Sequence, residues 1–120
     1  MKTAFAIAAL AIALAGHHHP PAHASSMAVG VSEREWHISS YRPKVRPGTI
    51  RFNVTNFGED AHNLQVVGPH GYRSTITPDL RSHDRYTLSV TLRAQGVYRL
   101  ICTKPGHIKA GMRTSIRVKR

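Results

Sequence analysis

A short stretch near the C terminus holds three side chains that bind soft metal ions. Four residues separate Cys102 from His107, and four more separate His107 from Met112. A second imidazole, His62, lies about forty residues upstream, at the entrance to a segment with strand character. Together these residues offer one thiolate, two imidazoles and one thioether.

This set of donors suits copper better than the common alternatives. Thiolate and thioether favour Cu(I), whereas imidazole also suits Cu(II). A trigonal site with one thiolate, two imidazoles and a weak axial thioether is a compromise between the geometries that the two oxidation states prefer. An electron can then enter or leave with little rearrangement. We therefore predict a copper site whose ligands are His62, Cys102, His107 and Met112.

Other interpretations explain less of the pattern. Structural zinc sites use Cys and His but not a thioether. A nucleophilic Cys–His pair leaves Met112 unexplained, and no acidic residue stands near the loop to orient His107. Taken singly, a buried Cys is usually a small hydrophobic residue, a His a surface group and a Met a core residue. Only their combination in one short loop indicates a metal.

The N-terminal segment has the pattern of a secretory signal peptide. A positive charge at Lys2 precedes an apolar run of 12 residues, 4–15, and residues 22–24 (Ala-His-Ala) offer a cleavage pattern. We predict that residues 1–24 are a leader; Ala15 is an alternative cleavage position. An apolar helix of 12 residues spans about 18 Å, which is too short for a membrane core of about 30 Å.

Residues 25–120 are then one domain in the periplasm or outside the cell. Disulfides form readily in those compartments, yet Cys102 is the only cysteine. An unpaired thiol there is expected to be occupied by a partner thiol, a metal or burial. This expectation agrees with the predicted copper site.

The segments that must position the ligands have strand character. In residues 49–56 and 86–92, apolar side chains alternate with polar ones. Turn residues separate these and other short segments every eight to twelve residues, and no helical spacing follows residue 25. We predict an all-β fold, an antiparallel Greek-key β-sandwich of about seven strands. Its expected strands include residues 29–38, 49–56, 63–67, 86–92, 97–102 and 114–118.

These motifs together resemble the cupredoxin family, the plastocyanin–azurin group of blue copper proteins. The resemblance covers residues 29–118, and the loop spacing is most similar to rusticyanin- and auracyanin-like members. It is carried by residues 48–56, 61–63, 96–102, Pro105-Gly106-His107 and Gly111-Met112.

The resemblance implies a role for each site residue. His62 is the ligand from the strand side, Cys102 the thiolate, His107 the second imidazole and Met112 the axial thioether. Asn63 supports the site, with its backbone N–H directed at the Cys102 sulfur and its side chain bonded toward Thr103. Ordinary turn capping is the alternative role for this pair. Many relatives have Gly soon after the Met, whereas this chain has Arg113.

The family resemblance implies a carrier of single electrons and not an enzyme, because catalytic relatives need further copper centres and residues 25–120 hold no second set of paired histidines. One alternative is a copper-delivery protein with the same ligands. A third interpretation, a polyanion-binding β-domain, rests on the net charge of +11 alone.

The positive charge also bears on partners. Seventeen Lys and Arg against six Asp and Glu favour an acidic redox protein such as a cytochrome, and also fit peripheral contact with an anionic membrane. The basic residues are spread singly along the sequence, and export argues against a genomic role, so we expect no nucleic-acid partner. We expect a monomer.

Overall fold

The structure, a computed structural model, describes residues 15–17 and 26–120. The predicted leader lies outside the described residues apart from 15–17, so the leader and both cleavage positions stay predictions. Within the described residues, no helix has the length and apolar character needed to cross a membrane.

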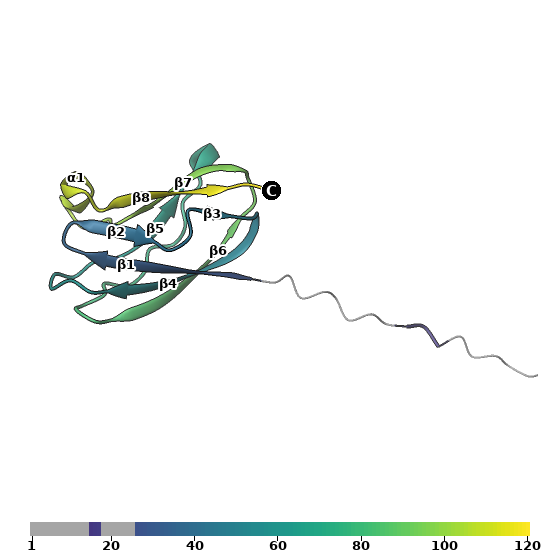
Figure 1. The fold of residues 1–120 in the computed structure, drawn as a ribbon, viewed down its shortest axis with the longest axis horizontal. Helices are drawn as coiled ribbons and strands as arrows, with labels where there is room; N and C mark the ends of the chain where they lie inside the picture. The colour runs from purple at the N-terminus through teal and green to yellow at the C-terminus, as the bar shows by residue number, and fades with distance from the viewer. Residues whose placement is uncertain (1–14, 18–25) are drawn as a thin grey trace, which may run out of the picture.

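Two four-stranded sheets pack face to face (Figure 1), which confirms the predicted β-sandwich. In spatial order, the first sheet consists of β2 (His37–Ser40), β1 (Met27–Arg34), β4 (Gly48–Asn56) and β6 (Arg85–Leu92). The second consists of β3 (Lys44–Val45), β8 (Arg113–Val118), β7 (Gly96–Ile101) and β5 (Gln65–Val67).

Two details of the predicted sheets are corrected. The structure has eight strands in its described residues, and the sheets are mixed, because β1 runs parallel to β4 and β3 runs parallel to β8. The strand predicted at residues 29–38 is a hairpin, in which the chain reverses at Glu35-Trp36 between β1 and β2. Alternation along one strand shows which side chains face the core, but not the direction of the neighbouring strand.

The core lies between the sheets and is filled by the alternating side chains. In β4, Ile50, Phe52 and Val54 are fully buried, as predicted. β7 lies between β8 and β5 in its sheet, and Val97 on its outer face is 47% exposed. Removing these apolar side chains from water stabilises the sandwich by about 25 cal/mol per Å² of buried apolar surface.

Two short helical turns interrupt the strands. The 3-10 turn η1 covers Pro69–Gly71, and α1 covers His107–Ala110 in the connection between β7 and β8. The sequence pattern predicted neither. α1 and the β1–β2 turn lie at the same end of the sandwich, and the C terminus lies at the other (Figure 1). The candidate metal ligands belong to the end that carries α1.

Candidate metal centre

The loop from Cys102 to Met112 is closed by its own backbone. Cys102 follows directly after β7, and its N–H donates to the carbonyl of Met112 at 3.2 Å. The N–H of Met112 donates to the carbonyl of His107 at 2.9 Å, and the N–H of His107 donates to Lys104 at 3.0 Å. These bonds fold the loop so that the backbones of Cys102, His107 and Met112 are linked directly.

Neighbouring residues explain two further features of this loop. A side chain at Gly111 would meet the carbonyl oxygen of Trp36 at 2.8 Å, and Gly111 has a φ of +126°, so this position requires glycine. Arg113 donates from Nη1 to the carbonyl of Ile108 at 3.0 Å. Arg113, which replaces the glycine expected at this point from the family resemblance, therefore bonds to the helical turn that carries His107.

The strand side of the centre is held by a separate network. His62 is fully buried and pairs with Leu80, with backbone N–H to carbonyl distances of 3.1 and 2.7 Å. The buried Asn56 donates from its side chain to the carbonyls of Leu80 and Asp60, both at 2.8 Å. The backbone on both sides of His62 is thereby fixed.

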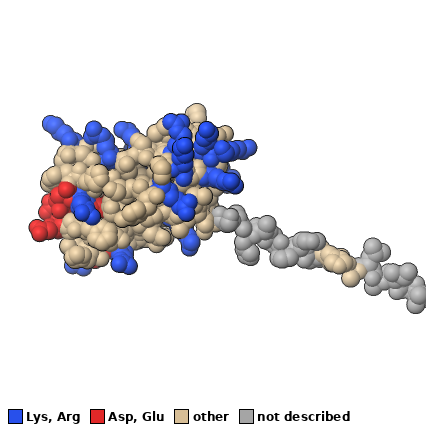
Figure 2. All heavy atoms as spheres, viewed as in Figure 1, with Lys and Arg blue, Asp and Glu red and all other residues tan. Residues whose placement is uncertain are grey.

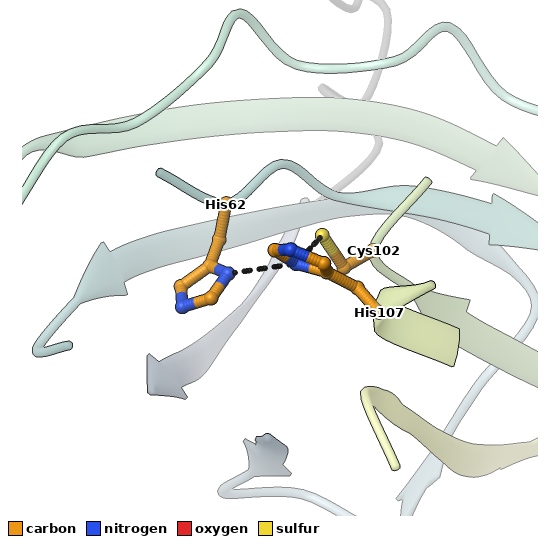
Figure 3. A group of neighbouring side chains, drawn as sticks. All are labelled: His62, Cys102 and His107. Carbon is orange, nitrogen blue, oxygen red and sulfur yellow. Dashed lines mark hydrogen bonds between the residues drawn. The ribbon is translucent and has the colours of Figure 1, made fainter. Parts of the chain in front are cut away.

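Three of the predicted ligands converge between these two regions. Figure 3 shows the imidazoles of His62 and His107 and the thiol of Cys102 pointing toward one another. The Nδ1 atoms of the two histidines lie 3.2 Å apart, and the Cys102 sulfur lies 3.4 Å from Nδ1 of His107. All three donor atoms lie within 4.8 Å of one another. The structure therefore brings together residues that are 45 positions apart in the sequence.

These distances fit a metal ion. Metal bonds of about 2.0–2.1 Å to nitrogen and about 2.3 Å to thiolate in a trigonal plane place the donors about 3.5–3.8 Å apart. The two observed distances, 3.2 and 3.4 Å, are slightly shorter than these values. One thiolate and two imidazoles fit copper, for the reasons of ligand softness given above.

Met112, the predicted axial ligand, is fully buried beside this cluster. Its backbone bonds link it to both Cys102 and His107. This placement agrees with the prediction, but the coordination of its sulfur stays a prediction.

Asn63 and Thr103 form the predicted contact. The N–H of Thr103 donates to Oδ1 of Asn63 at 2.7 Å, and Nδ2 of Asn63 donates to the Thr103 hydroxyl at 2.9 Å. Burial raises the pKa of the Cys102 thiol, and the backbone N–H groups of Asn63 and Lys104, which bond to the sulfur, oppose that rise. The same N–H groups would stabilise the thiolate that a metal requires.

Two site residues were missed in the sequence, Glu35 and Trp36 in the β1–β2 turn. Nε2 of His62 lies 2.9 Å from Oε1 of Glu35, and the Trp36 ring packs edge-on against His107 with centroids 4.9 Å apart. Hydrogen bonds from the backbone N–H groups of Glu59 and Asp60 hold the pKa of Glu35 at about 2. No spacing pattern marks such contacts. A lone Trp beside an acidic residue in a strand segment was the only available signal.

The contact with Glu35 bears on the tautomer of His62, and burial bears on the pKa of His107. Because the Glu35 carboxylate can only accept, Nε2 of His62 carries the proton and Nδ1 presents its lone pair to the cluster. Burial lowers the pKa of His107, with a further contribution from the nearby His62. Neutral imidazole is the form that binds metals.

A second carboxyl group, Glu33, lies close by in β1. It is fully buried, and neither of its oxygen atoms has a hydrogen-bond partner among the described residues. Burial raises its pKa to about 8. Glu33 is therefore neutral over most of the pH range in which Glu35, two residues later, is ionised.

Comparisons with known proteins agree with this site. A curated relative, a blue copper protein of Pisum sativum, is 34% identical over 67 residues, which make up 55% of this chain and 35% of the relative. The chain thus matches about a third of that relative's length. No protein-family model matches the chain.

Solved structures share the fold over most of the chain. An auracyanin from Roseiflexus castenholzii has a TM-score of 0.60 and 20% identity over 81% of this chain and 99% of its own. Rusticyanin from Thiobacillus ferrooxidans has a TM-score of 0.61 and 17% identity over 78% and 77%, respectively. A multicopper oxidase has a TM-score of 0.56 and 17% identity over 78% of this chain and 41% of its own. Identities this low show a common fold.

The sandwich brings one thiol and two imidazoles together in a group that could hold a metal ion. The chain shares the cupredoxin-type fold of these solved structures, and its sequence is similar to that of a blue copper protein. Copper is the cofactor that this set of donors fits.

Proposed function

We propose that the protein carries single electrons between redox partners outside the cytoplasm, through one copper ion held by His62, Cys102, His107 and Met112. The observation that carries this proposal is the convergence of one thiol and two imidazoles between hydrogen-bonded backbone segments on both sides. When bound, copper supplies a one-electron Cu(II)/Cu(I) couple. A site whose donors are already in place changes little with oxidation state, which favours fast electron exchange.

The burial of the donors argues against copper delivery. His62 and Cys102 are fully buried, and only His107 among the three clustered ligands is partly exposed. A delivery protein must release its metal to a partner, which is difficult for a site held below the surface. The partly exposed edge of His107 is instead suited to pass an electron while the ligands stay fixed.

Contact with a partner is proposed at the end that carries α1. Trp36 and Ile108 are 44% and 38% exposed there, and Lys109 and Arg113 add positive charge. The net charge of +11 would steer an acidic redox protein such as a cytochrome toward the molecule. Glu59 and Asp60 lie at the same end, so the local attraction is weaker than the net charge indicates. An apolar contact within a mixed rim suits a brief encounter between monomers.

The opposite end supports the proposed contact with an anionic membrane. Figure 2 shows Lys and Arg side chains gathered there, whereas the visible Asp and Glu lie toward the other end. The strands that meet at this end bring together cations that are scattered in the sequence, namely Lys44, Arg46, Arg117, Lys119 and Arg120. An anionic surface bound at this end would leave the copper end free for a redox partner.

Spectroscopy of the copper-loaded protein tests the proposal. We expect an intense visible absorption on adding Cu(II), which bleaches on reduction and returns on oxidation. Stopped-flow mixing with an acidic cytochrome should show electron exchange that slows as salt is added. A colourless copper adduct without exchange would favour delivery instead, and a protein that binds no copper would contradict both functions.

A further inference from the structure

The Glu35 side chain connects the β1–β2 turn to the buried ligand His62. Its Oε1 accepts from Nε2 of His62 at 2.9 Å and from the N–H of Asp60 at 2.8 Å. The N–H of Glu59 lies 3.0 and 3.1 Å from the two carboxylate oxygens. One carboxylate therefore bonds at once to a candidate metal ligand and to a backbone loop.

The loop around this carboxylate is built to receive it. Gly58 faces Glu35 so closely that a side chain at position 58 would overlap the carboxylate. The buried Asn56 accepts from the N–H of Gly58 at 2.8 Å and donates to the carbonyl of Asp60 at 2.8 Å. The loop is thus held in the shape that directs its N–H groups at Glu35.

From these contacts, and on the basis of the proposed copper site, we propose that Glu35 is a positioning residue that fixes the tautomer and ring orientation of His62 and favours Cu(II) over Cu(I). A carboxylate that accepts from the outer nitrogen of a ligating imidazole makes the inner nitrogen a stronger donor. Its negative charge also stabilises the more highly charged metal ion. The loop N–H groups and the His62 N–H all bond to the same carboxylate, so its position is fixed from both directions.

The variant Glu35→Gln separates the charge from the hydrogen bonds. An amide oxygen in the place of Oε1 can accept from His62, Glu59 and Asp60, and only the longer contact of Oε2 with Glu59 is lost. We expect this variant to bind copper, with the ratio of Cu(I) to Cu(II) affinity raised about tenfold, which is about 59 mV in reduction potential for one electron.

Glu59→Gln is the matched control, because it removes one negative charge from the same loop without touching His62. It should leave the affinity ratio within twofold of the wild-type value. Glu35→Ala removes the acceptor as well as the charge, and we expect it to weaken Cu(II) binding by about 10- to 100-fold. An unchanged ratio in Glu35→Gln, or an equal rise in Glu59→Gln, would overturn the proposed effect on the metal.

Nitrogen NMR of the metal-free protein tests the positioning role separately. In the wild-type protein and in Glu35→Gln, we expect the imidazole proton of His62 on Nε2. In Glu35→Ala, we expect the proton to exchange between Nδ1 and Nε2. A wild-type His62 with its proton on Nδ1 would contradict the positioning role. If the wild-type protein binds no copper, both the proposed function and the proposed effect of Glu35 on the metal are wrong. The tautomer of His62 in the metal-free protein still shows whether Glu35 positions the ring.

Discussion

The imidazoles of His62 and His107 have their Nδ1 atoms 3.2 Å apart, but the two rings are held in different ways. His107 belongs to an eleven-residue loop that closes on itself through backbone bonds between Cys102, His107 and Met112. His62 is fixed by residues from three other parts of the chain: Leu80, Asn56 and Glu35. The loop side is a local structure with one exposed edge, whereas the strand side is buried and depends on the whole fold.

This difference suits two tasks that the proposed electron carrier would perform. A buried, cross-linked side keeps the ligands in one geometry in both oxidation states. A partly exposed side gives a partner access to one ligand. The contrast predicts that changes on the two sides of the site will have different consequences, which the following experiments measure.

The largest effect is expected for Cys102→Ser, which removes the donor that both sides share. The hydroxyl is a poor ligand for a soft metal, so the visible absorption should vanish and copper affinity should fall by at least about 100-fold. Absorption spectroscopy and copper competition measure both. Circular dichroism should show an unchanged sandwich, and a Ser variant that keeps the colour would exclude Cys102 as the thiolate ligand.

The next test compares the two histidines directly. In His107→Gly, added imidazole should enter from solvent and restore the absorption of the copper-loaded protein, because His107 is partly exposed. In His62→Gly, the fully buried position should stay closed to imidazole. Titration of each variant with imidazole, followed by visible absorption, measures the contrast. Equal recovery in both variants would show that the two sides are equally accessible.

Glu33→Gln tests the buried side through the pH dependence of stability. The pKa of Glu33 is about 8 in the folded protein and 4.5 in its ordinary range. As pH rises, the Glu33 carboxyl therefore ionises in the unfolded state at a lower pH than in the folded state. The wild-type free energy of unfolding should therefore fall as pH rises from about 4.5 to 8, by an amount on the order of 5 kcal/mol.

Urea unfolding of the metal-free proteins at pH 5 and pH 8 measures this effect. Glu33→Gln should lack the fall, whereas the exposed Glu59→Gln should retain it. Equal pH slopes in the wild-type and Glu33→Gln proteins would mean that Glu33 ionises as readily in the folded state as in the unfolded state.

A smaller effect is expected when one hydrogen-bonding side chain is removed from each side. Asn63→Ala loses the bonds that join Asn63 to Thr103 and leaves the Thr103 N–H without its acceptor, at a cost of about 1–3 kcal/mol. Arg113→Ala loses one exposed bond to Ile108 and should cost about 0.5 kcal/mol or less. Chemical unfolding of both variants measures the loss in the free energy of unfolding. A larger loss in Arg113→Ala than in Asn63→Ala would contradict the proposed difference between the two sides.

A change confined to the metal is expected for Met112→Leu, which removes the axial thioether while filling a similar volume. Copper should remain bound by the three clustered donors. Loss of a weak axial ligand should change the ratio of Cu(I) to Cu(II) affinity by about tenfold, which is about 59 mV for one electron. Voltammetry measures this change. An unaltered potential and spectrum would indicate that Met112 is a core residue alone.

Local sequence patterns predicted the buried face of β4 and the candidate metal ligands. The alternation in residues 49–56 predicted the buried face of β4, because a strand directs successive side chains to opposite faces. Cys102, His107 and Met112 could be recognised because they lie within one loop, and softness of the donors indicated the metal. His62 was found by its place before a strand.

The contacts between residues that are distant in the sequence could not be predicted from local patterns. Glu35 and Trp36 reach the two imidazoles from a turn inside a segment predicted as one continuous strand, and the parallel pairings of β1 and β3 were not predicted either. The cations that gather opposite the copper end are likewise scattered in the sequence. The physical reason is that side-chain periodicity reports the environment of each residue, whereas its partners depend on how non-local strands pair and pack.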